Sequence, residues 1–95
     1  MKIELTAEKL TELEDLAACW FTEKEIALVL QVDDLELCTA IYRSGDTPEK
    51  KAFFRGRLRT EAETRQSVFE AAANGSGPAQ ALALKIIAET KLQSL

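Results

Sequence analysis

The segment KKAFFRGRLR, residues 50–59, contains the side chains best suited to bind a polyanion. It holds five basic residues and no acidic one. Lys51, Arg55 and Arg59 recur at four-residue steps, so on a helix they form one cationic stripe. Such a stripe can neutralise DNA backbone phosphates with little sequence preference, and the alternative is a solvated face that pairs with acidic residues of this chain or of a second copy. The residues assigned to phosphate contact are Lys50, Lys51, Arg55, Arg57 and Arg59.

A second candidate is the segment IALVLQVDDLELCTAIYR, residues 26–43, which has the spacing of a helix-turn-helix. Gln31 stands where glycine is commonest in such units, so the turn must bend without glycine or take a looser form. The alternative is an ordinary helical hairpin, because capped amphipathic helices resemble one another. The small residue at the crossing, the residues beside the turn and the anchors of the second helix are Ala27, Leu30, Val32, Leu37 and Ile41.

The second helix of this unit is acidic where a recognition helix reads bases. Asp33, Asp34 and Glu36 repel the phosphate-dense groove, and they also suit the positive end of a helix dipole. Thr39 and Arg43 are the residues of this helix that we assign to DNA contact. A single copy is therefore expected to bind double-stranded DNA weakly.

Catalytic constellations are absent from the sequence. The chain has no histidine, so neither a Ser-His nor a Cys-His pair can form. Cys19 and Cys38 lie in helical patterns beside apolar residues and are expected to be buried free thiols. The glycines of NGSGPAQ are not followed by Gly-Lys-Ser/Thr, so this segment is no phosphate-binding loop. We expect a non-enzyme with no catalytic residues, no cofactor and no metal.

The elements that must position these residues are all helices. Alternation typical of strands is missing, and Ala, Leu, Glu, Lys and Arg dominate. The first helix is expected from about Ala7 to Cys19, with an apolar stripe of Leu10, Leu13, Ala17 and Trp20. The expected N-caps of the first four helices are Thr6, Thr22 (in a capping box with Glu25), Asp33 and Thr47. The fourth helix is expected to run from Pro48 to about Ala73, with Gly56 as a weak point or a close-packing site.

A turn at NGSGP precedes a last helix from Pro78 that is apolar on almost all sides, which predicts a partner subunit. The expected fold is all-α: a three-helix helix-turn-helix head (residues 1–46), then a long helix and a C-terminal helix forming an antiparallel hairpin for oligomerisation (residues 47–95), in one compact unit. Residues 1–47 carry a formal charge of −7 and residues 48–95 one of +3, within a net charge of −4. No apolar run could span a bilayer, and the cytoplasm is the expected location.

This order of parts resembles the small terminase subunits of phages and prophages, which start DNA packaging. An AY-x-x-G-R type segment of that family is matched by Ala52, Phe53, Gly56 and Arg57, and the likeness extends from about Ala7 to Lys91. The stretch that follows is matched by Thr64, Arg65, Val68, Phe69, Ala72, Asn74 and Gly75. The resemblance implies a non-enzymatic homo-oligomer that binds viral DNA, assembles into a ring through its central helices and passes the DNA to a large terminase subunit. Summed over linked copies, weak contacts give usable avidity.

Two other functions are compatible with the sequence. The acidic second helix and the negative net charge favour an adaptor or regulator, whose helix-turn-helix-like head binds another protein and does not read DNA. A one-component transcription factor ranks below both, because the reading helix lacks basic and amide side chains.

Overall fold

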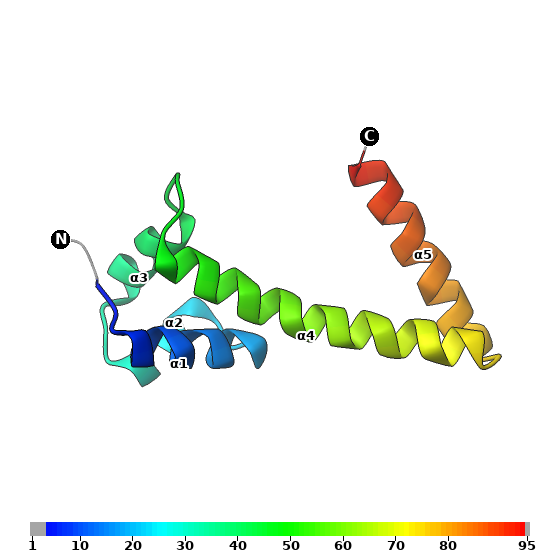
Figure 1. Cartoon of the computed structure of the whole chain (residues 1–95), viewed down its shortest axis with the longest axis horizontal. Helices are drawn as coiled ribbons and strands as arrows, with labels where there is room; N and C mark the ends of the chain where they lie inside the picture. Colours follow the sequence, from blue (N-terminus) through cyan, green and yellow to red (C-terminus); the bar gives the residue numbers. More distant parts are fainter. Residues whose placement is uncertain (1–3, 95) are drawn as a thin grey trace. The chain divides into compact units, whose positions relative to one another are not determined.

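The computed structural model describes residues 4–94, and all regular structure in that range is helical (Figure 1). The chain divides into two compact units, one ending at Thr60 and the other beginning at Glu61. The expected all-α class is confirmed. The helices are α1 (Ala7–Ala18), α2 (Glu23–Leu30), α3 (Asp34–Tyr42), α4 (Pro48–Ala73) and α5 (Gly77–Gln93).

The helices begin at the caps that the sequence predicts. The Thr6 hydroxyl accepts a hydrogen bond from the Lys9 amide, and the Asp33 carboxylate accepts one from the Glu36 amide at 3.0 Å. At α2 both bonds of the capping box with Thr22 are present, at 2.9 and 3.2 Å. The buried Thr47 hydroxyl accepts from the Lys50 amide at 3.0 Å. The four predicted N-caps are confirmed, because each depends only on residues close in sequence.

Three helices end in a Schellman motif. In this turn a residue with left-handed backbone conformation follows the helix, and two backbone amides donate to carbonyls of the last helical turn. At the end of α4 this residue is Gly75, with φ of 96°. At the ends of α1 and α2 it is Trp20, with φ of 61°, and Gln31, with φ of 60°. Glycine is the usual residue here, since an L-residue in the left-handed region costs ~1–2 kcal/mol. Trp20 and Gln31 therefore hold conformations that other contacts must stabilise.

The core of the first unit lies among α1, α2, α3 and the beginning of α4. Ala52 and Phe53 of α4 are buried in it. Gly56 lies so close to α1 that an added Cβ atom would sit 2.1 Å from the Glu14 carbonyl oxygen, so it is the expected close-packing site. The largest fully buried side chains are Leu13, Ile26, Leu30, Leu37 and Ile41.

Two expectations about burial are wrong. Trp20 was expected in the apolar stripe of the first helix, but the helix ends before it and the side chain is 53% exposed. The expectation that both thiols are buried is also wrong, because Cys19 is exposed and Cys38 is only half-buried. Both thiols are free, as expected. The error at Trp20 has a local cause, since its left-handed conformation turns the chain off the face of α1.

The second unit consists of the later part of α4 and α5. Ala79 and Ala83 of α5 are buried, and the Gln80 side-chain amide donates to the Ala72 carbonyl at 3.1 Å. Four apolar side chains on the rest of α5 are exposed within this unit: Leu82, Leu84, Ile87 and Leu92.

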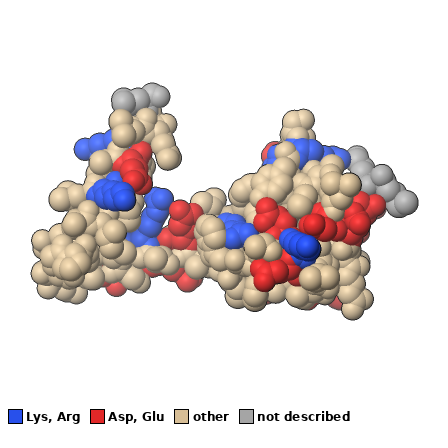
Figure 2. All heavy atoms as spheres, turned by 180° about the vertical axis from the view of Figure 1, so that it is seen from behind, with Lys and Arg blue, Asp and Glu red and all other residues tan. Residues whose placement is uncertain are grey.

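The boundary between the units follows Thr60, because the first half of α4 packs with the three preceding helices. The basic segment 50–59 therefore folds into the unit that holds the acidic head. Residues 1–60 contain nine basic and twelve acidic residues, so the opposed charges of the two sequence halves largely offset one another within one unit. Figure 2 shows blue and red atoms side by side on the surface of this unit.

Candidate nucleic-acid interface

The cationic stripe of α4 lies against acidic residues of α1. Arg55 lies 3.5 Å from the Glu14 carboxylate, while Arg59 lies 3.1 Å from Glu14 and 3.3 Å from Asp15. The contact follows from the close approach of the helices at Gly56, which brings Arg55 and Arg59 to the α1 surface. The stripe is thus partly neutralised inside the first unit.

These ion pairs are exposed and therefore weak. The side chains of Arg55 and Arg59 are 68% and 44% accessible, and pairs of this kind contribute ~0.2–1 kcal/mol. A phosphate could compete for either arginine at similar free-energy cost. Lys51, on the same face, is exposed and forms no ion pair with any residue between 4 and 94.

Arg57 points away from this stripe and packs into the first unit, where it is mostly covered by other side chains. Its side chain is only 13% exposed, and the guanidinium stacks over the rings of Trp20 at 4.4 Å and Phe53 at 4.7 Å. It also donates a hydrogen bond to the Phe21 carbonyl at 2.7 Å and lies 3.7 Å from the Glu23 carboxylate. With its face and edge both occupied, Arg57 connects α4 to the turn after α1 and to the start of α2.

The cluster extends to Tyr42, whose phenol donates a hydrogen bond to Glu23. That bond, together with burial and the neighbouring charge, raises the pKa of Tyr42 to about 12. The same bond is the main cause that lowers the pKa of Glu23, with a smaller contribution from Arg57. Tyr42 also packs edge-on against Phe53 and Phe54, at ring distances of 6.2 and 6.1 Å.

The two candidate residues of α3 are placed four residues apart on its exposed side. The Thr39 hydroxyl donates to the Leu35 carbonyl at 2.8 Å, and Arg43 follows the end of the helix with an exposed side chain. Lys50 lies next to them, but its ammonium donates to the carbonyls of Arg43 and Gly45. Lys50 therefore stabilises the end of α3 and has fewer donors left for phosphate.

The structure divides the seven predicted residues among three environments. Thr39 and Arg43 line one cleft, which Lys50 adjoins through its bond to the Arg43 carbonyl. Lys51 and Arg55 line another cleft with α1, and Arg59 continues that face. Arg57 lies apart from both clefts, where it stacks on the rings of Trp20 and Phe53.

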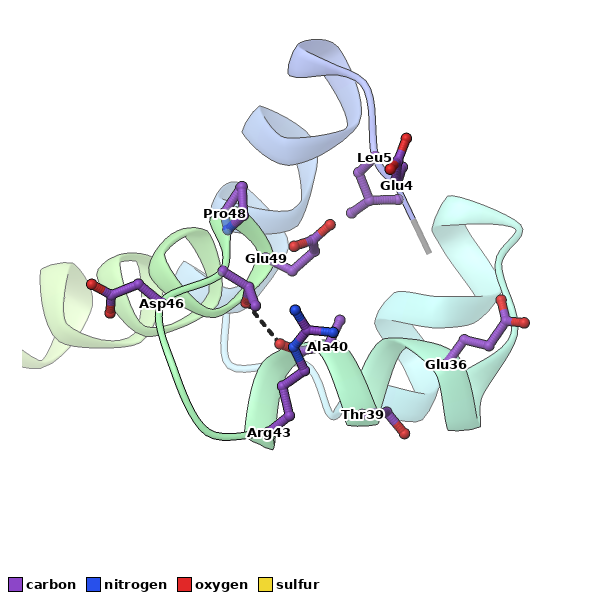
Figure 3. A pocket seen from close by; sticks show the side chains of 10 residues that line it. Glu4, Leu5, Glu36, Thr39, Ala40, Arg43, Asp46, Pro48 and Glu49 are labelled. Carbon is purple, nitrogen blue, oxygen red and sulfur yellow. Dashed lines mark hydrogen bonds between the residues drawn. The ribbon is translucent and has the colours of Figure 1, made fainter. Parts of the chain in front are cut away.

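One feature of the first unit escaped the sequence-based interpretation. The cleft beside α3, of about 370 Å³, is lined on opposite sides by Glu36, Asp46 and Glu49, with Arg43 among them (Figure 3). Segment 4–5 completes its wall. No local sequence pattern predicts this cleft, because its walls combine residues 4–5, which precede α1, with α3 and the start of α4.

Within residues 4–94, no cluster of three or more cysteine and carboxylate side chains is arranged to hold a metal ion. None of the helices in that range has both the length and the apolar character needed to cross a bilayer. No protein-family model, curated protein or solved structure matches the chain.

Proposed function

We propose that this protein is a non-enzymatic, self-associating DNA-binding protein of the small terminase subunit type, which binds DNA as an assembly and delivers it to a large terminase subunit. In this proposal α1–α3 form a helix-turn-helix head. The α4–α5 hairpin is the assembly region. The proposal rests on the turn between α2 and α3 and on the exposed apolar side chains of α5.

The turn is the observation that carries the proposal. Gln31 takes φ of 60° and ψ of 44°, the left-handed conformation that glycine usually supplies in a helix-turn-helix. The Val32 amide then bonds to the Ala27 carbonyl at 3.0 Å, and α3 begins at Asp34. This short left-handed connection between two capped helices is the geometry that a helix-turn-helix requires.

Self-association is supported by the second unit. Leu82, Leu84, Ile87 and Leu92 of α5 are exposed, while the buried residues of this helix are the small Ala79 and Ala83. Large apolar side chains outside and small ones inside are typical of a helix that packs against a further chain.

The electrostatics explain why assembly is needed for DNA binding in this proposal. A phosphate that binds Arg55 or Arg59 must displace the carboxylates of α1, so each head contributes little net free energy. Several linked heads on one duplex add their small contributions, and avidity then exceeds the affinity of any head by orders of magnitude.

The test is duplex-DNA binding by fluorescence anisotropy at about 50 mM and about 200 mM salt. Wild-type protein is expected to bind at low salt and to lose affinity steeply at the higher concentration. Arg43→Ala and Lys51→Ala should weaken binding, whereas Lys85→Ala, on exposed α5, is the control that should not. Absence of binding at low salt would remove DNA from the proposed function.

The adaptor function is a second candidate, favoured by a specific observation. Arg55 and Arg59 already have carboxylate partners, and Arg57 is enclosed by Trp20 and Phe53. With these cations engaged, the acidic residues of the head outnumber its available cations, which suits a basic protein partner. This function predicts no measurable DNA affinity for the assembled protein and no effect of Arg43→Ala or Lys51→Ala.

A further inference from the structure

We propose that the cleft beside α3 is a binding site for a basic side chain, lysine or arginine, of a partner protein. Its walls are the outer side of α3, the start of α4 and segment 4–5 (Figure 3). At about 370 Å³ it lies at the lower end of the size range of ligand-binding clefts, which suits one long side chain. The inference does not depend on the DNA-binding proposal.

Glu49 is the main observation. The residue is only 7% exposed, yet within residues 4–94 its carboxylate has no hydrogen-bond or ion-pair partner. The neighbouring Thr47 is equally buried but satisfied, since its hydroxyl donates to the Ala40 carbonyl at 2.8 Å. In the part of the chain that the structure describes, no side-chain oxygen or nitrogen that is completely buried lacks a hydrogen-bond partner. Because the Glu49 oxygens have no partner, they must therefore retain some access to the cleft. Figure 3 shows this carboxylate pointing into it.

The position of Glu49 at the start of α4 accounts for part of this arrangement. The second helical position lies near the positive end of the helix dipole, which stabilises a carboxylate by ~0.3–1 kcal/mol. That field does not supply hydrogen-bond donors to the carboxylate oxygens, so a buried carboxylate still gains from a cationic donor.

The surrounding charges select the ligand. Glu4, Glu36, Asp46 and Glu49 contribute four carboxylates to the lining, against the one guanidinium of Arg43, which forms no ion pair within the described chain. An ammonium or guanidinium group can donate to several of these oxygens at once. Leu5 and Pro48 offer apolar surface to the methylene groups behind that head. Because the carboxylates outnumber the single guanidinium, the cleft favours a cation over a phosphate.

The test uses a labelled tri-arginine peptide with blocked ends, titrated with the full chain. Glu49→Gln and Glu36→Gln should each weaken binding about tenfold, the loss of one charge-assisted hydrogen bond. Glu8→Gln and Glu12→Gln change the net charge equally at exposed positions of α1 outside the cleft, and should change affinity less than about twofold. Equal losses in all four variants would show attraction to overall charge only and overturn the proposal.

Arg43 provides a second readout that separates this site from DNA binding. Arg43→Ala removes the one positive charge that repels a basic ligand from the cleft, so it should strengthen peptide binding, while the DNA-binding proposal expects it to weaken duplex binding. On adding the peptide, the amide resonances of Ala40 and Thr47 should shift. If Glu49→Gln does not fold, Glu36→Gln and these shifts decide. Shifts confined to other surfaces, or tighter binding of duplex DNA than of peptide at this cleft, would refute the inference.

Discussion

Arg57 joins more of the first unit than any other cation of the basic segment. Its guanidinium stacks on Trp20 and Phe53, bonds to the Phe21 carbonyl and lies beside Glu23. Arg57→Ala should lower the free energy of unfolding by about 2–4 kcal/mol, since it removes the stacking of a side chain that is only 13% exposed and a charged hydrogen bond. Arg57→Lys should recover less than half of this loss, because an ammonium lacks the planar face. Urea denaturation measures both.

The matched control is Arg55→Ala, which removes an exposed ion pair and should cost no more than about 1 kcal/mol. If Arg57→Ala and Arg55→Ala destabilise the protein equally and slightly, then Arg57 is not a structural residue. Its assignment to phosphate contact would then regain support.

Tyr42 is the chain's single tyrosine, so its ionisation can be followed directly by ultraviolet absorbance. The hydrogen bond to Glu23 raises the pKa of the phenol to about 12, so ionisation should be centred about two pH units above that of free tyrosine. A raised pKa favours the protonated form in the folded protein. The stability that this bond contributes is therefore complete below about pH 10 and is lost as the pH rises towards about 12.

Glu23→Gln should shift the Tyr42 titration back towards the ordinary value, because both the charged acceptor and its field are removed. Circular dichroism recorded over the same range would show whether the fold persists. A titration centred near pH 10 in folded wild-type protein would contradict the hydrogen bond. On the acid side, the lowered pKa of Glu23 predicts that its contribution is lost only as the pH falls below the usual carboxylate range.

At the scale of elements, the contact between α1 and α4 depends on the absence of a side chain at Gly56. A Cβ atom there would lie 2.1 Å from the Glu14 carbonyl oxygen and 2.9 Å from the Ala17 Cβ atom. Gly56→Ala should therefore destabilise the protein by at least about 2 kcal/mol, although alanine is the better helix former. Gly77→Ala, which meets open space at the start of α5, should be neutral or stabilising. Stabilisation by both changes would argue against close packing at Gly56.

The α2–α3 turn permits the opposite prediction. Gln31 occupies the left-handed region, where glycine has no steric cost. Gln31→Gly should raise the free energy of unfolding by about 0.5–1 kcal/mol, the relief of backbone strain less the extra entropy of glycine in the unfolded chain. Thermal denaturation against Gln31→Ala, which keeps the strain, isolates this effect. If glycine destabilises the turn, the conformation at Gln31 is not left-handed.

The elements that the sequence predicts best are those with local causes. The caps at Thr22 and Thr47 and the extent of α4 depend on neighbours in the chain, and each is confirmed. The turn at Trp20 was missed because its left-handed conformation opposes the residue's own preference. Pairing of the stripe with acidic residues of this chain was one of two open alternatives, but its partner Glu14 was not identified, and the stacking of Arg57 on Trp20 was not predicted. Charge spacing places these side chains on a helix face but does not say which other helix that face meets.

At the scale of the whole molecule, segregated charge in the sequence becomes mixed charge in the fold. The basic segment 50–59 packs with the acidic head, so one copy does not present a fully unpaired cationic surface of that segment for DNA to bind. In the proposed function, DNA binding then depends on how many copies come together. The exposed leucines of α5 predict self-association, which light scattering should detect at micromolar concentration.

Leu84→Glu combined with Leu92→Glu should reduce the molar mass in solution to that of one chain, because both charges would be buried in an interface between copies. Thr90→Glu is the control on the same helix, an exposed polar position that should leave the assembly intact. A wild-type protein that stays monomeric at the highest attainable concentration would exclude the assembly.

The measurement that bears most directly on the proposed function compares duplex-DNA affinity of the assembled wild type with that of the Leu84→Glu, Leu92→Glu variant at about 50 mM salt. The account predicts at least about tenfold weaker binding by the monomeric variant, since avidity is lost while every cation of the head remains. Equal affinity, or no binding by the assembled protein, would contradict it.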